Sequence, residues 1–155
     1  GEERSLKAVL PVVKEFGAAV IGLCMDDDGI PETPEDRLRG ANKIIERAGK
    51  LGIPVADVVI DPLALTMGAD ANAGRLALDA IELIVKEFGV NITMGASNIS
   101  FGMPDRAVLN SAWVAMVIDA GGTALIADTY PSRCRGCLEA HPRSCQKAPR
   151  PCRRR

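Results

Sequence analysis

Asn98 is the residue of this sequence whose surroundings most suggest chemistry. It lies between two serines in the stretch MGASNISFG, residues 94–102, where an apolar strand is expected to give way to a helix. A carboxamide has two hydrogen-bond donors and an acceptor at fixed geometry, and it does not titrate near neutral pH. An asparagine in such a place is often only a turn residue. Gly95 favours a functional interpretation, because it lets a ligand approach the backbone.

Asp61 is the second candidate, at the end of the apolar run in VVIDPLAL, residues 58–65. One interpretation is structural, in which the carboxylate caps the next helix or binds loop amides. The other is a ligand site. A carboxylate can accept two parallel hydrogen bonds from an amide-amidine edge, such as the 2-amino-pyrimidinone face of a pterin. These residues alone leave both interpretations open.

A repeated helix-strand pattern must position these side chains. Apolar residues at helical spacing predict helices that each lead into a short apolar strand. The strands are predicted at residues 18–23, 57–62, 90–96 and 124–128, and the last helix at about 104–120. In the first three helices, the apolar residues at helical spacing are as follows. The first helix has Leu6, Val9, Leu10, Val13 and Phe16, and the third has Leu78, Ile81, Ile84, Val85 and Phe88. The second has Ala41, Ile44, Ile45, Ala48 and Leu51, which are expected to face inward. The strands are continuously apolar, as in a parallel sheet covered on both faces, and they predict an α/β fold.

Polar residues recur at one place in this pattern, the carboxyl end of each strand. They are Asp26 to Asp28, Asp61, Ser97 with Asn98, and Asp128. A doubly wound sheet and a barrel both fit the alternation, but the active sites of eight-stranded α/β barrels are built from these strand ends. Four units are half of such a barrel. We therefore predict half of a (β/α)8 TIM barrel with parallel strands.

Charge and cysteine content divide the chain into two parts. Residues 1–132 hold 11 Lys+Arg against 19 Asp+Glu, and residues 133–155 hold 8 against 1, so the net charge of −1 conceals parts of −8 and +7. Cys24 ends an apolar strand, where a buried reduced thiol is the expected state. No apolar run approaches the roughly 20 residues of a membrane span, and no secretion signal is present. We expect a cytoplasmic protein without a membrane partner.

The tail SRCRGCLEAHPRSCQKAPRPCRRR, residues 132–155, admits two interpretations. Cys134, Cys137, His141 and Cys145 have nearly a zinc-knuckle spacing, and such clusters with flanking arginines can bind metal and nucleic acid. The abrupt change in composition instead indicates a reading-frame shift, and the three prolines and seven arginines argue against a packed element. We favour the second interpretation, with no metal and no nucleic acid bound. The predicted domains are 1–131, a partial barrel, and 132–155, an irregular, disordered tail.

Three segments carry a family resemblance: VIDPL (59–63), MGASNISFGMPDRAVLN (94–110) and IADTYP (126–131). With the spacing between them, they resemble the second half of the pterin-binding barrel of methyltetrahydrofolate:corrinoid methyltransferases. The same barrel occurs in the folate domain of cobalamin-dependent methionine synthase. The resemblance runs from residue 1 to about 131 and implies the C-terminal half of the TIM barrel. Dihydropteroate synthase shares the fold, but DPLAL and GASNIS match neither of its motifs.

The resemblance implies a role for each candidate residue. Asp61 would bind the pterin edge, and Asn98 would hydrogen-bond N5 and stabilise positive charge there as the methyl group leaves. Arg106 would lie beside the site, although a surface ion pair with Asp105 or another acid is an alternative. The substrate-binding candidates besides Asp61 are Gly95, Ser97, Arg106 and Asp128.

The resemblance also implies the reactants. Methyltetrahydrofolate would be the methyl donor, and the acceptor would be the cobalt of cobalamin or another corrinoid on a partner such as a corrinoid iron-sulfur protein. Full-length members would form a homodimer. The family's first four strands carry further pterin contacts and are absent here, so we interpret the chain as a fragment of a longer gene product. The alternatives are a non-catalytic pterin-binding or assembly module and a dihydropteroate-synthase-like pterin enzyme.

Overall fold

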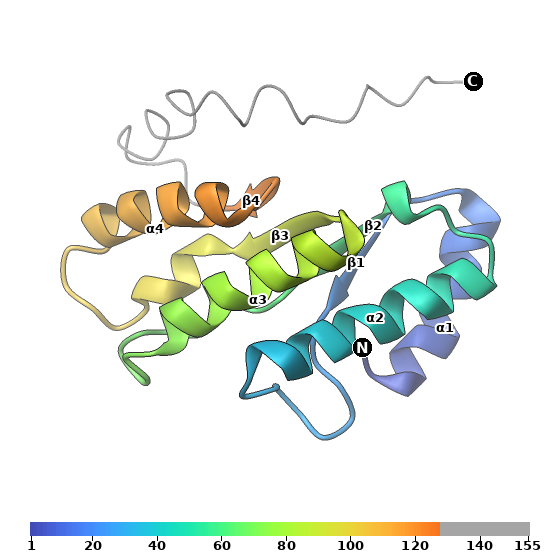
Figure 1. The fold of residues 1–155 in the computed structure, drawn as a ribbon, viewed down its shortest axis with the longest axis horizontal. Coiled ribbons are helices and arrows are strands. Elements are labelled where there is room, and N and C mark those ends of the chain that lie inside the picture. Colours follow the sequence, from blue (N-terminus) through green and yellow to red (C-terminus); the bar gives the residue numbers. More distant parts are fainter. Residues whose placement is uncertain (128–155) are drawn as a thin grey trace.

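The structure is a computed structural model that describes residues 1–127, in which helices and strands alternate along the chain (Figure 1). The helices are α1 (Glu3–Phe16), α2 (Pro34–Lys50), α3 (Ala73–Phe88) and α4 (Arg106–Ala120). The strands are β1 (Val20–Leu23), β2 (Val58–Asp61), β3 (Asn91–Gly95) and β4 (Ala124–Ile126). Two 3₁₀ helices, η1 (Val55–Asp57) and η2 (Ala96–Ser100), flank β2 and β3. The predicted order of elements is confirmed.

The four strands form one parallel sheet in the order β1-β2-β3-β4 (Figure 1). Strands adjacent in the chain are adjacent in the sheet, and a helix connects each pair. The register places Leu23 beside Asp61 and Gly95 beside Ile126. Strands added in one direction without reversal are typical of a barrel, whereas a doubly wound sheet reverses its order at a switch point. The chain therefore forms part of a TIM barrel.

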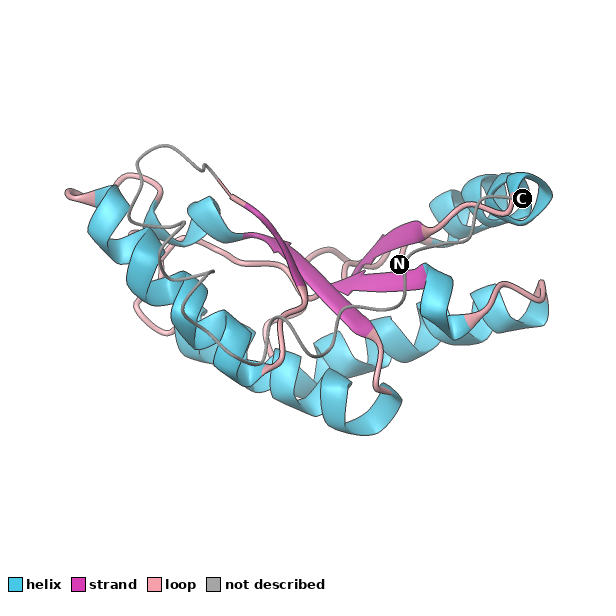
Figure 2. Cartoon of the chain, turned by 90° about the horizontal axis from the view of Figure 1, so that it is seen from above, coloured by secondary structure: helices cyan, strands magenta, loops and turns pink. Residues whose placement is uncertain are grey.

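The helices cover one face of the sheet and leave the other face open (Figure 2). Between helices and sheet lies an apolar core that includes Ile44, Ile60, Ile81, Ile84, Ile92, Met94, Val114 and Val117. On the open face, Ile21, Leu23 and Ile126 are 52%, 40% and 63% exposed. Within residues 1–127 this second face is uncovered, so burial on both faces, which the apolar strands predict, is not seen for these three side chains. This second face is the one that points into the interior of a barrel.

The predicted signals account for the ends of the helices. Thr33 caps α2, because its hydroxyl accepts a hydrogen bond from the Asp36 amide at 3.1 Å, and Pro34 takes the first helical position. α3 ends at Gly89, whose φ of 61° is the left-handed conformation that favours glycine. Within residues 1–127, no helix is long and apolar enough to cross a membrane.

Two predicted apolar stripes are only partly buried. Leu6 and Leu10 of α1 belong to the core, but Val9 is 48% and Phe16 75% exposed. The reason is that α1 packs on α2 along one flank while its other flank has no neighbouring helix in the described part of the chain. Leu51, expected to face inward, is 41% exposed because α2 ends at Lys50 and the chain turns away there.

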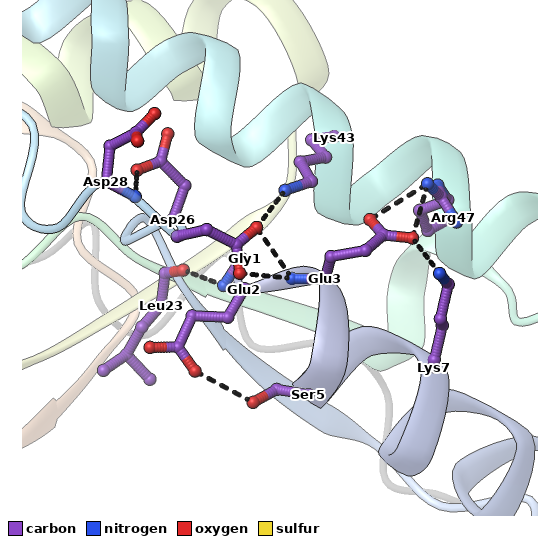
Figure 3. Close-up of polar contacts among 11 residues, drawn as sticks. Gly1, Glu2, Glu3, Ser5, Lys7, Leu23, Asp26, Asp28, Lys43 and Arg47 are labelled. Atoms are coloured by element: carbon purple, nitrogen blue, oxygen red, sulfur yellow. Dashed lines mark hydrogen bonds and ion pairs between the residues drawn. The ribbon is translucent and has the colours of Figure 1, made fainter.

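Polar contacts join the start of α1 to α2 and to the loop after β1 (Figure 3). Arg47 of α2 binds the Glu3 carboxylate at 2.9 Å. The Asp27 carboxylate accepts hydrogen bonds from the Glu3 amide at 3.2 and 3.3 Å, and so caps α1. Asp26 closes a turn by accepting from the Asp28 amide at 3.0 Å. The acids that follow β1 therefore include one that caps a helix and one that stabilises a turn.

Candidate functional site

The carboxyl ends of β2 and β3 bring the two main candidates to the same edge of the sheet. β2 ends at Asp61, and β3, its hydrogen-bonded neighbour, ends at Gly95 immediately before the turn that carries Asn98. Carboxyl ends of parallel strands form the active-site face of α/β barrels. The structure thus assembles a carboxylate and a carboxamide on adjacent strand ends, as the sequence pattern predicted.

Asp61 is half-buried and oriented by its own loop. Its Oδ1 accepts a hydrogen bond from the Leu63 amide at 2.8 Å. Burial raises the pKa of the Asp61 carboxyl above its ordinary value, while the Leu63 hydrogen bond and the positive charge of Arg37 act to lower it. One carboxylate oxygen is therefore engaged in the loop, which is part of the structural role that the sequence left open. The remaining acceptor capacity is what a ligand edge could use.

Asn98 lies exposed in η2 with its side chain folded over Gly95. A methyl group added at Gly95 would come within 2.9 Å of Asn98 Nδ2 and 3.3 Å of its Cγ. Carbon atoms at such distances from other heavy atoms overlap, so only glycine leaves room for this conformation of the asparagine. The glycine at the end of β3 thus leaves the space that the carboxamide occupies, and ligand approach at Gly95 stays a prediction.

A polar network holds the turn that presents Asn98. Arg106, at the start of α4, donates from Nη2 to the Ser97 carbonyl at 2.9 Å and from Nε to the Ser100 hydroxyl at 3.1 Å. The buried Ser100 hydroxyl donates to Asn110 Oδ1 at 2.6 Å. The Arg106 guanidinium also lies 5.4 Å from the centre of the Phe101 ring. Among the described residues, Arg106 makes these contacts and not the ion pair with Asp105 or another acid that was the alternative, and the contacts tie η2 to α4.

Three residues of this edge were missed in the sequence. Ser100 and Asn110 belong to the motif SNISFGMPDRAVLN, and their short distance from Arg106 in the sequence could have indicated that the three side chains interact. Arg37 carried no such signal, because it lies on α2 and contacts the loop after β2. Its position 25 residues before Pro62 becomes meaningful only once the fold brings the two segments together.

The remaining sequence predictions concern Cys24, metal binding and the residues after β4. Cys24 is buried and free, as predicted, and burial raises the pKa of its thiol to about 12. Residues 1–127 contain no group of three His, Cys, Asp or Glu side chains that could hold a metal ion. Asp128 and the cysteine-rich tail lie outside the described residues.

Comparison with known proteins places the chain in a family. Residues 1–128 match the family model described as pterin binding enzyme, so the chain belongs to the pterin-binding enzymes. It is similar to the methionine synthases of Mycobacterium tuberculosis and Mycobacterium leprae, with 32% and 33% identity over 129 residues. It is also 24% identical over 133 residues to the methylcorrinoid:tetrahydrofolate methyltransferase of Eubacterium limosum. The family recognised from the three motifs is confirmed.

The similarity covers unequal shares of the aligned proteins. It includes 78% of this chain but 11% of each methionine synthase, and 83% of this chain but 48% of the Eubacterium limosum protein. The chain therefore spans about half the length, or less, of these relatives.

Proposed function

We propose that this chain forms the C-terminal half of the catalytic barrel of a methyltransferase that moves the N5 methyl group of methyltetrahydrofolate to the cobalt of a corrinoid protein. The observation that carries the proposal is the placement of two polar side chains at the carboxyl ends of neighbouring strands: the Asn98 carboxamide over Gly95 after β3, and the Asp61 carboxylate at the end of β2. Membership of the pterin-binding enzymes and similarity to methionine synthases support the same activity.

In this proposal, Asp61 recognises the pterin. Its Oδ1 is held by the Leu63 amide, which fixes the plane of the carboxylate before the ligand arrives. Two parallel hydrogen bonds from the amino and ring N–H groups of a pterin would then meet a charged acceptor of matching geometry. This interaction is present before and during methyl transfer, so it contributes to binding rather than to rate.

Asn98 acts at the nitrogen that loses the methyl group. When cobalt(I) attacks the methyl carbon, the electron pair of the carbon-nitrogen bond stays on N5, so this tertiary amine is a poor leaving group unless it takes a proton from solvent, which then remains on N5 of tetrahydrofolate. A carboxamide placed at N5 can accept from or donate to that nitrogen without changing its own protonation state. In comparable sites, one preorganised polar group stabilises the transition state by about 3 to 4 kcal/mol.

The other site residues shape and support this arrangement. Gly95 leaves room for the Asn98 side chain. Arg106 donates to the Ser97 carbonyl and so supports the turn, and Ser97 and Arg106 are also proposed as substrate contacts. Asp128, beyond the described residues, follows β4 in the chain and is proposed as a further substrate contact.

The methyl acceptor belongs to a partner. We propose a corrinoid protein, which includes the corrinoid iron-sulfur type, and a homodimer in the full-length enzyme. The name of the Eubacterium limosum relative describes transfer from a methylcorrinoid to tetrahydrofolate. A site that stabilises charge at N5 lowers the barrier in both directions, because the forward and reverse reactions share one transition state.

The test is methyl transfer by the full-length protein. Methyltetrahydrofolate is mixed with cob(I)alamin, and the loss of cob(I)alamin absorbance is followed together with formation of tetrahydrofolate. We expect turnover that depends on Asn98 and Asp61. Tight folate binding without any turnover, with either cob(I)alamin or a corrinoid protein, would contradict the enzyme and favour a pterin-binding module.

A further inference from the structure

Arg37 is a buried charged residue to which the proposed reaction assigns no role. Its side chain is in the first turns of α2 and is only 1% exposed. Arginine is almost never fully buried unless its charge is paired, because removing the guanidinium from water is costly. Because burying this guanidinium costs free energy, we expect the Arg37 side chain to have a specific structural or functional role.

The hydrogen bonds of Arg37 go to main-chain carbonyls at the candidate site. Nη1 donates to the Pro62 carbonyl at 2.7 Å and to the Leu63 carbonyl at 2.6 Å. Nε donates to the Pro31 carbonyl at 3.3 Å. The guanidinium therefore joins the loop after β1 to the loop after β2, and its planar fork sets the direction of each bond.

Leu63 has a backbone conformation that needs support. Its φ is 68°, and it is one of two non-glycine residues with positive φ in the described part of the chain. A leucine avoids this conformation because its Cβ crowds the backbone. The Leu63 amide nevertheless donates to Asp61 Oδ1, while its carbonyl accepts from Arg37. One strained residue thus connects the buried arginine to the site carboxylate.

We propose that Arg37 is a positioning residue, which holds Pro62 and Leu63 in the conformation that orients the Asp61 carboxylate toward the pterin. The inference rests on the proposed function, because it assumes that Asp61 recognises the ligand. Arg37 touches no ligand in this account. It acts on Asp61 through the main chain of Leu63, and its positive charge also favours the charged form of that carboxyl.

The test compares substitutions at Arg37 with a matched substitution on the same helix, in the full-length protein. Arg37→Met keeps the length of the side chain and removes every donor. Arg47→Met is the control, since Arg47 pairs with Glu3 on the helix side of the sheet. We expect Arg37→Met to raise the KM for methyltetrahydrofolate about tenfold with kcat within about twofold, and Arg47→Met to change neither.

A double-mutant cycle with Asp61→Asn separates positioning from general structural damage. If Arg37 acts through Asp61, Arg37→Met should change the KM by less than about twofold once Asp61 is asparagine. Arg37→Lys keeps the charge and one donor but loses the planar fork, so it should still raise the KM, by about threefold, and it provides the same cycle if Arg37→Met does not fold.

Three results would overturn the inference. The first is a parental KM in folded Arg37→Met or Arg37→Lys. The second is an equal loss in both backgrounds, which indicates a structural role only. The third is a loss at Arg37 while Asp61→Asn binds methyltetrahydrofolate like the parent, and this result alone would also contradict the proposed role of Asp61.

Discussion

At the scale of single residues, Asn98 is exposed, and its side chain lies over Gly95, where a larger residue would leave no room for it. Replacing it with alanine removes the carboxamide but no core contact. In the full-length enzyme, Asn98→Ala should slow methyl transfer about 10²- to 10³-fold, while folate affinity changes much less. Stopped-flow loss of cob(I)alamin absorbance and calorimetric titration measure the two effects. Turnover within a few-fold of the parent would end the assignment.

Gly95 allows a second test that leaves Asn98 itself in place. Gly95→Ala should displace the asparagine, because the new methyl group would lie 2.9 Å from Nδ2. The exposed side chain can move, so we expect the free energy of unfolding to change little and methyl transfer to fall at least tenfold. Gly49→Ala is the control, since nothing lies within 4 Å of the methyl group added there. Equal turnover in the two variants would show that the position of Asn98 does not matter.

Asp61→Asn should separate binding from stability. Burial raises the pKa of Asp61 in the folded state, so the folded chain binds this proton more tightly than the unfolded chain. The stability that this group contributes is therefore present below the ordinary carboxyl pKa and is lost as pH rises through the raised value. Asparagine can still accept from Leu63 without the buried charge.

We consequently expect Asp61→Asn to bind methyltetrahydrofolate at least tenfold more weakly and to be as stable as the parent, or more so, at pH 7. The free energy of unfolding of the parent falls as pH rises from the ordinary carboxyl pKa to the raised pKa of Asp61. We expect this fall to be smaller in Asp61→Asn. Calorimetric titration and thermal unfolding from pH 3 to pH 8 measure these effects. An unchanged affinity, or a clear loss of stability at pH 7, would favour the structural interpretation of this carboxylate.

At the scale of elements, η2 depends on α4. Ser100 is fully buried, accepts from Arg106 and donates to Asn110. Ser100→Ala leaves both partners without this contact and should lower the free energy of unfolding by about 1 to 3 kcal/mol and reduce turnover. Ser5→Ala, which removes an exposed hydrogen bond to Glu2, should cost less than about 0.5 kcal/mol. Chemical denaturation of both variants makes the comparison, and similar costs would contradict the network.

The elements show what the sequence could and could not predict. Apolar spacing, the Thr33-Pro34 start and the glycine ends depend on local physics, so the sequence predicted the four α-helices and four strands of residues 1–127 but not the 3₁₀ helices η1 and η2. Asp61 and Asn98 could also be predicted from local sequence, because each lies where an apolar strand ends. Arg37 could not be found this way, because its carbonyl partners lie on another loop and carry no side-chain signature.

At the scale of the whole molecule, burial was the least predictable property. Apolar spacing indicates which side of α1 is hydrophobic but not whether a neighbour covers it. Val12 and Phe16 of α1 are 51% and 75% exposed, and the open face of the sheet adds Ile21 and Ile126. Both edge strands, β1 and β4, also have one side unpaired within the described residues. Exposed apolar surface and open strand edges of this kind favour association.

We therefore expect the 155-residue chain, expressed by itself, to self-associate at micromolar concentrations. Val12→Lys with Phe16→Lys should raise the monomer fraction, because charged side chains on the open flank of α1 disfavour apolar contact there. Val55→Lys is the matched control, since Val55 is 46% exposed in η1, away from that flank. Size-exclusion chromatography with light scattering measures the mass of each. A monomeric parent, or an equal response to the control substitution, would show that the open faces do not drive association.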